Sequence, residues 1–196
     1  MPVDSAKTAR VLAKRFAVLR TRDFERHNVP RSDLKELVLS GIWEKTARSL
    51  YRSTLVEPSP HQTLLEVAHK CPRGVICLLS ALQFHGIGTQ LPSEVWMALD
   101  RRAWKPALRY PPLRIVRFTG PALTEGVERR TIEGRTVSVY GVAKTIADCF
   151  KYRNKIGLDV ALEALREAWR EKRMTSDDIW RYAKVCRVAN VMRPYL

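Results

Sequence analysis

The chain has 196 residues, of which 45% are hydrophobic, so it can bury a core in one large domain or in two smaller ones. It carries 35 Lys and Arg against 20 Asp and Glu, a formal net charge of +15. Such an excess attracts polyanions and favours a nucleic-acid partner. No stretch has the apolar length of a membrane span, and the N-terminus lacks a signal-peptide core. We therefore expect a cytoplasmic protein with no membrane partner.

The four cysteines include no Cys-x-x-Cys pair, so we expect reduced thiols. A zinc site can be drawn from Cys71, Cys77, His69 and His85, but their spacing matches no standard zinc finger. The apolar neighbours of Cys77 favour buried thiols instead. We expect no metal and no cofactor.

The first predicted element is a helix over residues 5–16, in which small and apolar residues recur at helical spacing. Val18 and Leu19 fit a short strand or an extended link. Thr21 or Asp23 then starts a short helix whose Phe24 faces the core.

A turn at residues 27–30 leads into a second amphipathic helix over residues 31–40. Leu34, Leu37 and Val38 form its buried stripe, and Gly41 ends it. This spacing turns the charged and polar residues of the first turns outward, where a recognition helix contacts base edges.

Two strands, at 42–45 and 49–52, complete a winged helix-turn-helix. The wing turn predicted at 44–47 contains no Gly or Asn, so we expect a longer or less regular wing. Trp43 and Tyr51 are predicted to pack in the core and not to serve as stacking platforms.

Outward basic and polar residues of this region are the candidate DNA ligands. An arginine at the start of the recognition helix can bind guanine through two hydrogen bonds, and wing cations suit the DNA backbone. For Arg31 and Lys35, an ordinary solvated helix face remains the alternative. The candidate DNA-binding residues are Arg31, Ser32, Lys35, Lys45, Arg48, Arg52, Thr21 and Arg22.

The Pro-rich segment 57–60 is the best boundary, which divides the chain into domains at 1–56 and 57–196. The second domain alternates helical and strand patterns. Helices are expected at 60–68, 75–85, 142–151, 158–170 and 176–186, and strands at 95–99, 113–118, 127–132 and 137–140. The predicted fold class is α+β: an N-terminal winged helix-turn-helix followed by a larger mixed α+β domain ending in helices.

A basic run with no acidic residue lies between positions 101 and 117, interleaved with Trp104 and Tyr110. It can bind DNA backbone beyond the winged helix, bind RNA, contact a partner protein, or be only a solvated loop. These alternatives stay open. The possible second basic patch consists of Arg101, Arg102, Lys105, Arg109, Arg114 and Arg117.

The main alternative function is a metal-dependent nuclease or another nucleic-acid-processing enzyme. Asp100 ends a strand, and Glu133-Gly134-Arg135 resembles half of a nuclease site. Arginine cannot give up a proton as the usual lysine can, however. Asp148 is better explained as an i,i+4 partner of Lys144. We expect no enzyme, and keep a protein-interaction module as a third possibility.

Segment 31–52 resembles the winged helix of the AbiEi family, the antitoxin and regulator component of AbiE-type (type IV) toxin–antitoxin systems. Members usually show a leucine-bearing helix, a glycine, a short strand and a basic Arg-Gly-Leu-Tyr-Arg-like strand. Here the last element is Arg48-Ser49-Leu50-Tyr51-Arg52, with Ser49 in place of the glycine. Segments 80–86, 144–151 and 157–165 extend the resemblance over nearly all of the chain.

The resemblance implies a DNA-binding transcriptional repressor that autoregulates a two-gene operon by binding inverted repeats in its promoter. It also implies an antitoxin that counteracts a nucleotidyltransferase-like toxin, directly or indirectly. Cooperative monomers and a dimer on DNA are both compatible with it.

Overall fold

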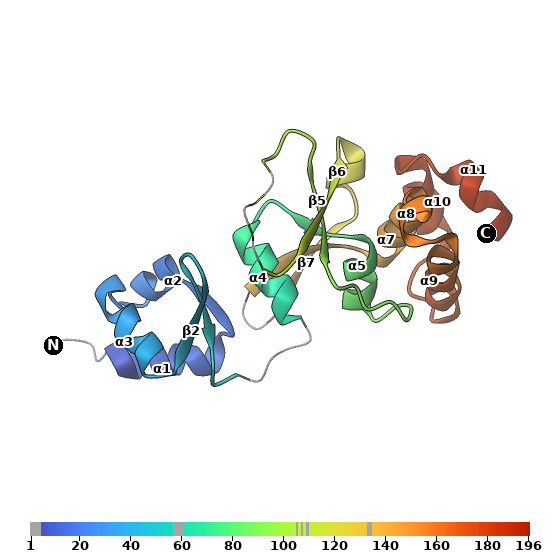
Figure 1. Cartoon of the computed structure of the whole chain (residues 1–196). Coiled ribbons are helices and arrows are strands. Elements are labelled where there is room, and N and C mark those ends of the chain that lie inside the picture. The colour runs from blue at the N-terminus through green and yellow to red at the C-terminus, as the bar shows by residue number, and fades with distance from the viewer. Residues whose placement is uncertain (1–4, 57–60, 105, 107, 109, 133–134) are drawn as a thin grey trace. The chain divides into compact units, whose positions relative to one another are not determined.

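The computed structural model describes residues 5–56, 61–104, 106, 108, 110–132 and 135–196 (Figure 1). The chain divides into two compact units. Unit 1 comprises Met1–Leu65 and Thr131–Thr136, and unit 2 comprises Glu66–Arg130 and Val137–Leu196. The boundary segment expected at 57–60 lies outside the described residues. As predicted, the fold is mixed α+β, with a winged helix followed by a larger part that ends in helices.

Unit 1 has the element order of a winged helix-turn-helix. Its three strands form one antiparallel sheet in the order β1-β3-β2. The elements are α1 (Ser5–Arg15), β1 (Val18–Arg20), α2 (Thr21–Arg26), a 3-10 turn η1 (Arg31–Asp33), α3 (Leu34–Leu39), β2 (Trp43–Ala47) and β3 (Leu50–Ser53).

Aromatic side chains join the helices of unit 1 to its sheet. Phe24 on α2 is fully buried, and its ring meets that of Trp43 edge-on at 4.8 Å and that of Tyr51 at 5.6 Å. The indole Nε1 of Trp43 donates to the carbonyl of Ala9 at 3.2 Å, which satisfies the one polar atom of this buried side chain. The packing roles predicted for Trp43 and Tyr51 are confirmed.

The wing differs from the expectation. β2 continues to Ala47, and the turn lies at Arg48 and Ser49, so the turn predicted at 44–47 was wrong. Ser49 takes φ +58°, the left-handed conformation that glycine would adopt more easily. A register shift between Lys45 and Ala47 marks a bulge in β2. The wing is therefore tight at its tip and irregular within its first strand.

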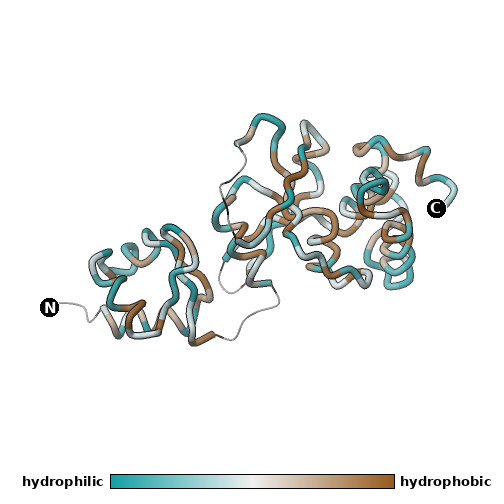
Figure 2. The backbone as a smooth tube through the Cα atoms, viewed as in Figure 1, coloured by the Kyte–Doolittle hydropathy of each residue, from teal (hydrophilic) through white to brown (hydrophobic). Residues whose placement is uncertain are grey.

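Unit 2 contains most of a five-stranded mixed sheet in the order β6-β5-β4-β8-β7, of which residues 131–136 are counted in unit 1. β5 pairs with β6 in parallel and with β4 antiparallel, while β4 pairs with β8 in parallel. The strands are β4 (Val75–Ile76), β5 (Val95–Asp100), β6 (Leu113–Phe118), β7 (Val127–Ile132) and β8 (Arg135–Tyr140). β5 is buried from Val95 to Leu99 and appears as a hydrophobic stretch in Figure 2.

The helices of unit 2 gather around α7, which contacts α5, α9 and α10 (Figure 1). α7 is buried from Ala143 to Phe150. The longer helices are α4 (Gln62–Lys70), α5 (Leu78–His85), α7 (Val142–Lys151), α9 (Leu158–Arg170) and α10 (Ser176–Val185); the shorter turns are α6 (Pro121–Thr124), α8 (Arg153–Ile156), α11 (Ala189–Met192) and η2 (Arg193–Tyr195).

One predicted helix of unit 2 was partly wrong. The helix expected at 75–85 begins only at Leu78, because Val75 and Ile76 form β4, in the middle of the sheet. A two-residue strand buried on both sides shows no alternation of polar and apolar residues, so its sequence cannot be told from a buried helical turn.

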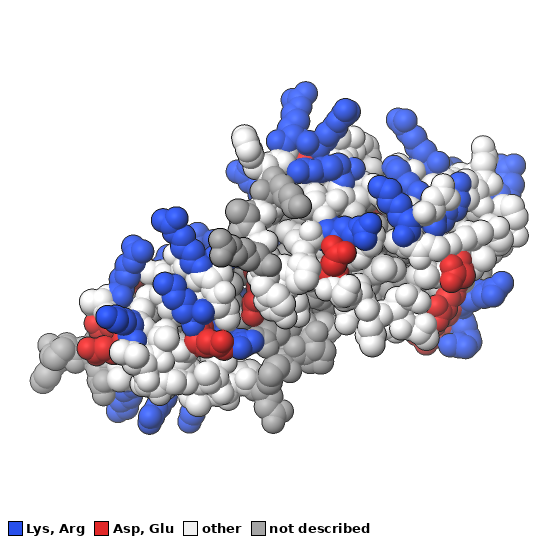
Figure 3. All heavy atoms as spheres, in the orientation of Figure 1, with Lys and Arg blue, Asp and Glu red and all other residues white. Residues whose placement is uncertain are grey.

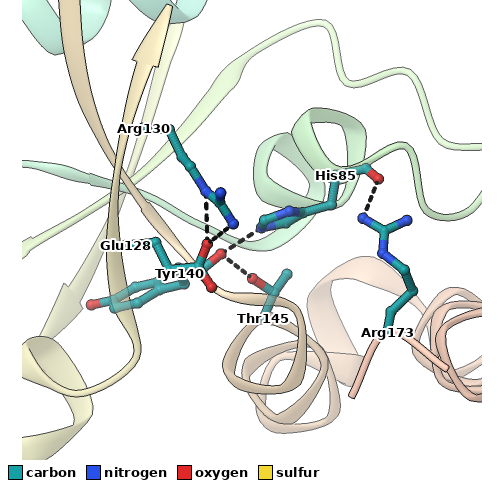
Figure 4. A network of polar contacts seen from close by, with 6 residues as sticks. All are labelled: His85, Glu128, Arg130, Tyr140, Thr145 and Arg173. Atoms are coloured by element: carbon teal, nitrogen blue, oxygen red, sulfur yellow. Dashed lines mark hydrogen bonds and ion pairs between the residues drawn. The ribbon is translucent and has the colours of Figure 1, made fainter.

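His85 ties the end of α5 to the start of α7 (Figure 4). Its Nε2 donates to the carbonyl oxygen of Tyr140 at 2.7 Å, and the Thr145 hydroxyl donates to the same oxygen at 3.1 Å. Arg173 donates to the carbonyl of His85 at 3.1 Å. α5 then ends at Gly86, with φ +64°, as the sequence predicted.

Within the described ranges, no helix combines the length and apolar character that a membrane crossing requires.

Candidate nucleic-acid interface

The recognition helix of unit 1 has one buried and one exposed side. Leu34 and Leu37 are 3% and 4% exposed and belong to the core of the winged helix. Arg31 and Lys35 are exposed on the first turns. Arg31 follows the extended residue Pro30 and begins the 3-10 turn that leads directly into α3. The structure therefore presents both cations to solvent, as an interface with DNA requires.

Ser32, another candidate, is also exposed, but its hydroxyl donates to Asp33 at 2.7 Å. Hydrogen bonds from the hydroxyls of Ser32 and Ser5 hold the pKa of Asp33 below its ordinary value. Asp33 and Glu36 line an open groove of about 540 Å³ between α1 and α3, together with Lys7 and Arg10 among others.

The wing candidates are placed differently from one another. Lys45 and Arg48 are exposed, Lys45 on β2 and Arg48 in the turn. Arg52 on β3 is half-buried and forms an ion pair with Glu44, its neighbour across the strands. The structure thus gives Arg52 a partner within the wing, and a phosphate would have to compete with Glu44 for it.

The two candidate residues on α2 also differ in their exposure to solvent. Arg22 is exposed, but Thr21 is 8% exposed and packs at the junction of β1 and α2, where its backbone N–H donates to Ser49. Its side chain is therefore not available to a ligand on the surface, and Thr21 does not belong to the candidate interface. In Figure 3, Lys and Arg side chains protrude from unit 1 over α2 and β2.

The basic run at 101–117 does not form a uniform patch. Arg101 and Arg102 are exposed at the end of β5. Arg114 stacks over the ring of Trp96 at 4.6 Å and lies 3.6 Å from Glu94, whereas Arg117 donates to backbone carbonyls. The candidates Lys105 and Arg109 lie outside the described residues.

The residues proposed for enzyme chemistry are engaged elsewhere. Asp100 accepts the backbone N–H of Arg102 at 2.8 Å. Arg135 lies 2.8 Å from Asp23, both counted in unit 1, and Glu133 and Gly134 lie outside the described residues. Across the residues that the structure describes, no three His, Cys, Asp or Glu side chains are grouped to hold a metal ion.

Sequence reasoning missed the acidic side of the recognition helix. It turned the charged and polar residues of the first turns outward but gave Asp33 no role. The signal was present in the Ser32-Asp33 pair, because a serine beside an aspartate at a helix start commonly forms such a local hydrogen bond.

Comparison with known proteins supports the winged helix. Residues 7–54 match the family model described as "Transcriptional regulator, AbiEi antitoxin". The crystal structure of the RV2827C protein from Mycobacterium tuberculosis is similar in fold, with a TM-score of 0.64 at 12% identity, covering 94% of this chain and 72% of that one. A comparison with curated proteins gives no match.

The family expected from the sequence is thereby confirmed where the family model applies. The description of the family model names regulators and antitoxins, and so it favours a regulatory role over an enzymatic one. Over residues 7–54, which include the winged helix, the chain is thus similar to the AbiEi family of antitoxins and transcriptional regulators.

Proposed function

We propose that the chain is a transcriptional repressor that binds double-stranded DNA through its winged helix. One observation carries this proposal: Arg31 and Lys35 are exposed on the first turns of the recognition helix, while Leu34 and Leu37 of the same helix are in the core. This is the arrangement with which helix-turn-helix proteins place cationic side chains in the major groove.

The wing adds a second set of contacts. Lys45 and Arg48 are exposed on the hairpin that follows the recognition helix, where cations suit phosphates or the minor groove. The net charge of +15 supports the same partner. We assign base recognition to Arg31, with Lys35 at a base or a phosphate, and backbone contacts to Lys45, Arg48 and Arg22.

We further propose that the target is the promoter of the operon that encodes this chain, and that the site is an inverted repeat. Two copies, bound as a dimer or cooperatively, would then occupy half-sites one helical turn or a multiple apart. The partner gene would encode a nucleotidyltransferase-like toxin, which the chain counteracts directly or indirectly in a cytoplasmic setting. The family of residues 7–54 supports this regulatory antitoxin role.

A gel-shift titration of the full chain tests the proposal. The probes are a duplex of the chain's own upstream region and a shuffled duplex of equal length, each at two salt concentrations. We expect tighter binding of the promoter and a steep loss of affinity with salt on both probes. Equal affinity for both probes would contradict specific repression, and weak binding without salt dependence would favour a protein-interaction module. Growth rescue on co-expression with the neighbouring gene tests the antitoxin role.

A further inference from the structure

The loop that joins β5 to β6 in unit 2 holds two aromatic rings in solvent. Trp104 is 94% exposed and Tyr110 is 72% exposed. By contrast, Trp96 on the adjoining strand is 5% exposed and belongs to the core. An aromatic side chain of this size is normally buried at least in part, so the two exposed rings on this loop are available to stack on a ligand.

Trp104 follows a turn at the end of β5 that several hydrogen bonds hold in place. The Ala103 N–H donates to the carbonyl of Asp100 at 3.0 Å, and the Arg102 N–H donates to the Asp100 carboxylate at 2.8 Å. Nη1 of Arg117 on β6 donates to the carbonyls of Asp100 and Ala103, at 2.8 and 2.7 Å. Arg117 thus fastens the turn immediately before Trp104 to the neighbouring strand.

The ring of Tyr110 lies shortly before the start of β6, where a backbone hydrogen bond holds the chain in place. Tyr110 is followed by the buried Pro111, and the carbonyl of Pro112 accepts the N–H of Val95 at 2.9 Å. The two aromatic residues therefore stand at the fixed ends of the loop. A ligand that stacks on them would find their backbone already positioned, which lowers the entropic cost of binding.

The surroundings of these rings are cationic. Arg101 and Arg102 are exposed directly before Trp104, and Asp100 is the acidic residue beside them. Figure 3 shows Lys and Arg side chains standing out over this end of β5 and β6. Protein interfaces are also rich in tryptophan, tyrosine and arginine, so a protein partner is one of the outcomes that the experiment below distinguishes.

We propose that this aromatic–arginine loop, defined by Arg101, Arg102, Trp104 and Tyr110, binds unpaired nucleotides of a single-stranded nucleic acid. Bases stack on exposed aromatic rings without regard to sequence, and arginines neutralise the adjoining phosphates. A duplex hides the faces of its bases, so this ligand differs from the one proposed for the winged helix. The loop uses only residues of unit 2, and the inference does not rest on the proposed function.

Fluorescence anisotropy of the full chain with labelled oligo(U) and oligo(dT), each of about 12 nucleotides, tests the proposal. We expect both to bind, and Trp104→Ala to weaken that binding by roughly 5- to 150-fold, the effect of losing one stacked base. Trp104→Phe should retain most of the affinity. Tighter binding of one probe would tell whether RNA or unwound DNA is the natural source of the nucleotides.

The matched control is Trp169→Ala, which removes a tryptophan that is 50% exposed on α9 of the same unit. It should leave oligonucleotide affinity unchanged. Equal affinities of the Trp104→Ala and Trp169→Ala variants, or no binding of either oligonucleotide at low salt, would overturn the proposal; the second result would leave a protein partner for this surface.

Two further variants separate this site from the winged helix. Arg31→Ala should leave binding of the oligonucleotides intact, and Trp104→Ala should leave binding of promoter duplex intact. If Trp104→Ala weakened duplex and single strand by the same factor, the loop would be a general backbone contact and the proposal would be wrong.

Discussion

Lys144 and Asp148 form an ion pair inside unit 2, with Nζ 2.5 Å from Oδ2 and neither side chain exposed to solvent. The ammonium also lies over the rings of Tyr140 and Phe118, at 4.1 and 4.9 Å, and the Cys186 thiol donates to the other carboxylate oxygen at 3.1 Å. Burial raises the pKa of Asp148 more than Lys144 lowers it. The pair therefore depends on both partners being present.

Replacing Lys144 alone should cost much of the stability of the protein. Lys144→Met leaves a buried carboxylate without its cation, and we expect the free energy of unfolding to fall by about 3–5 kcal/mol. The double variant Lys144→Met, Asp148→Leu should recover a large part of that loss. Urea denaturation measures both, with Lys184→Met, at an exposed position on α10, as the near-neutral control. Equal midpoints for Lys144→Met and Lys184→Met would contradict the buried pair.

His85 should make the free energy of unfolding depend on pH in the mildly acidic range. Burial lowers the pKa of His85 from its ordinary value of 6.5, and it outweighs the hydrogen bond to the carbonyl of Tyr140, which acts to raise that pKa. A lowered folded pKa contributes stability above the unfolded value, and this contribution is lost as the pH falls through the folded pKa. His85→Gln should therefore shrink the loss of urea midpoint between about pH 7.5 and about pH 5.5. His27→Gln, at an exposed position in unit 1, should leave that loss unchanged.

The amphipathic character of the recognition helix can be tested within one element. Leu34 is 3% exposed and Leu39 is 78% exposed on the same helix. Leu34→Ala should lower the free energy of unfolding by about 2–5 kcal/mol, because it leaves a cavity in the core of unit 1. Leu39→Ala should change it by less than about 0.5 kcal/mol. Similar losses for both would mean that α3 is turned differently from the described orientation.

Much of this fold could be predicted from the sequence because its helices and longer strands are strongly periodic. The stripe of Leu34 and Leu37 fixed which side of the recognition helix is outward, and so which cations are available. The hydrogen bond of Ser32 to Asp33 and the ion pair of Arg52 with Glu44 depend on side-chain placement that periodicity does not encode. The burial of Thr21 depends on the sheet, which brings β3 beside β1.

The wing turn shows most clearly where prediction from the sequence fails. The sequence predicted no tight turn in the wing, because the residues of its predicted turn include no Gly or Asn. Pairing of β2 with β3 nevertheless places the turn at Arg48 and Ser49, with Ser49 in the left-handed conformation. Tertiary structure thus overrode a local preference at the cost of some strain.

Ser49 substitutions test that strain. Ser49→Gly should be neutral or stabilising by up to about 1 kcal/mol, because relief of the left-handed conformation is partly offset by the greater freedom of glycine in the unfolded chain. Ser49→Val should destabilise by about 1–3 kcal/mol, since a β-branched residue tolerates positive φ poorly. Chemical denaturation compares the two. A destabilising glycine and a neutral valine would argue against the described wing turn.

The most direct test of base recognition by the winged helix is the specificity of the Arg31→Ala variant. Affinities for promoter and shuffled duplex are measured side by side for wild type, Arg31→Ala and the control Lys184→Ala. We predict that Arg31→Ala lowers the ratio of promoter to shuffled affinity by roughly 5- to 150-fold, the worth of one two-bonded arginine–guanine contact, while Lys184→Ala leaves it unchanged. An unchanged ratio for Arg31→Ala, with equal losses on both duplexes, would contradict the assignment of Arg31 to a base edge.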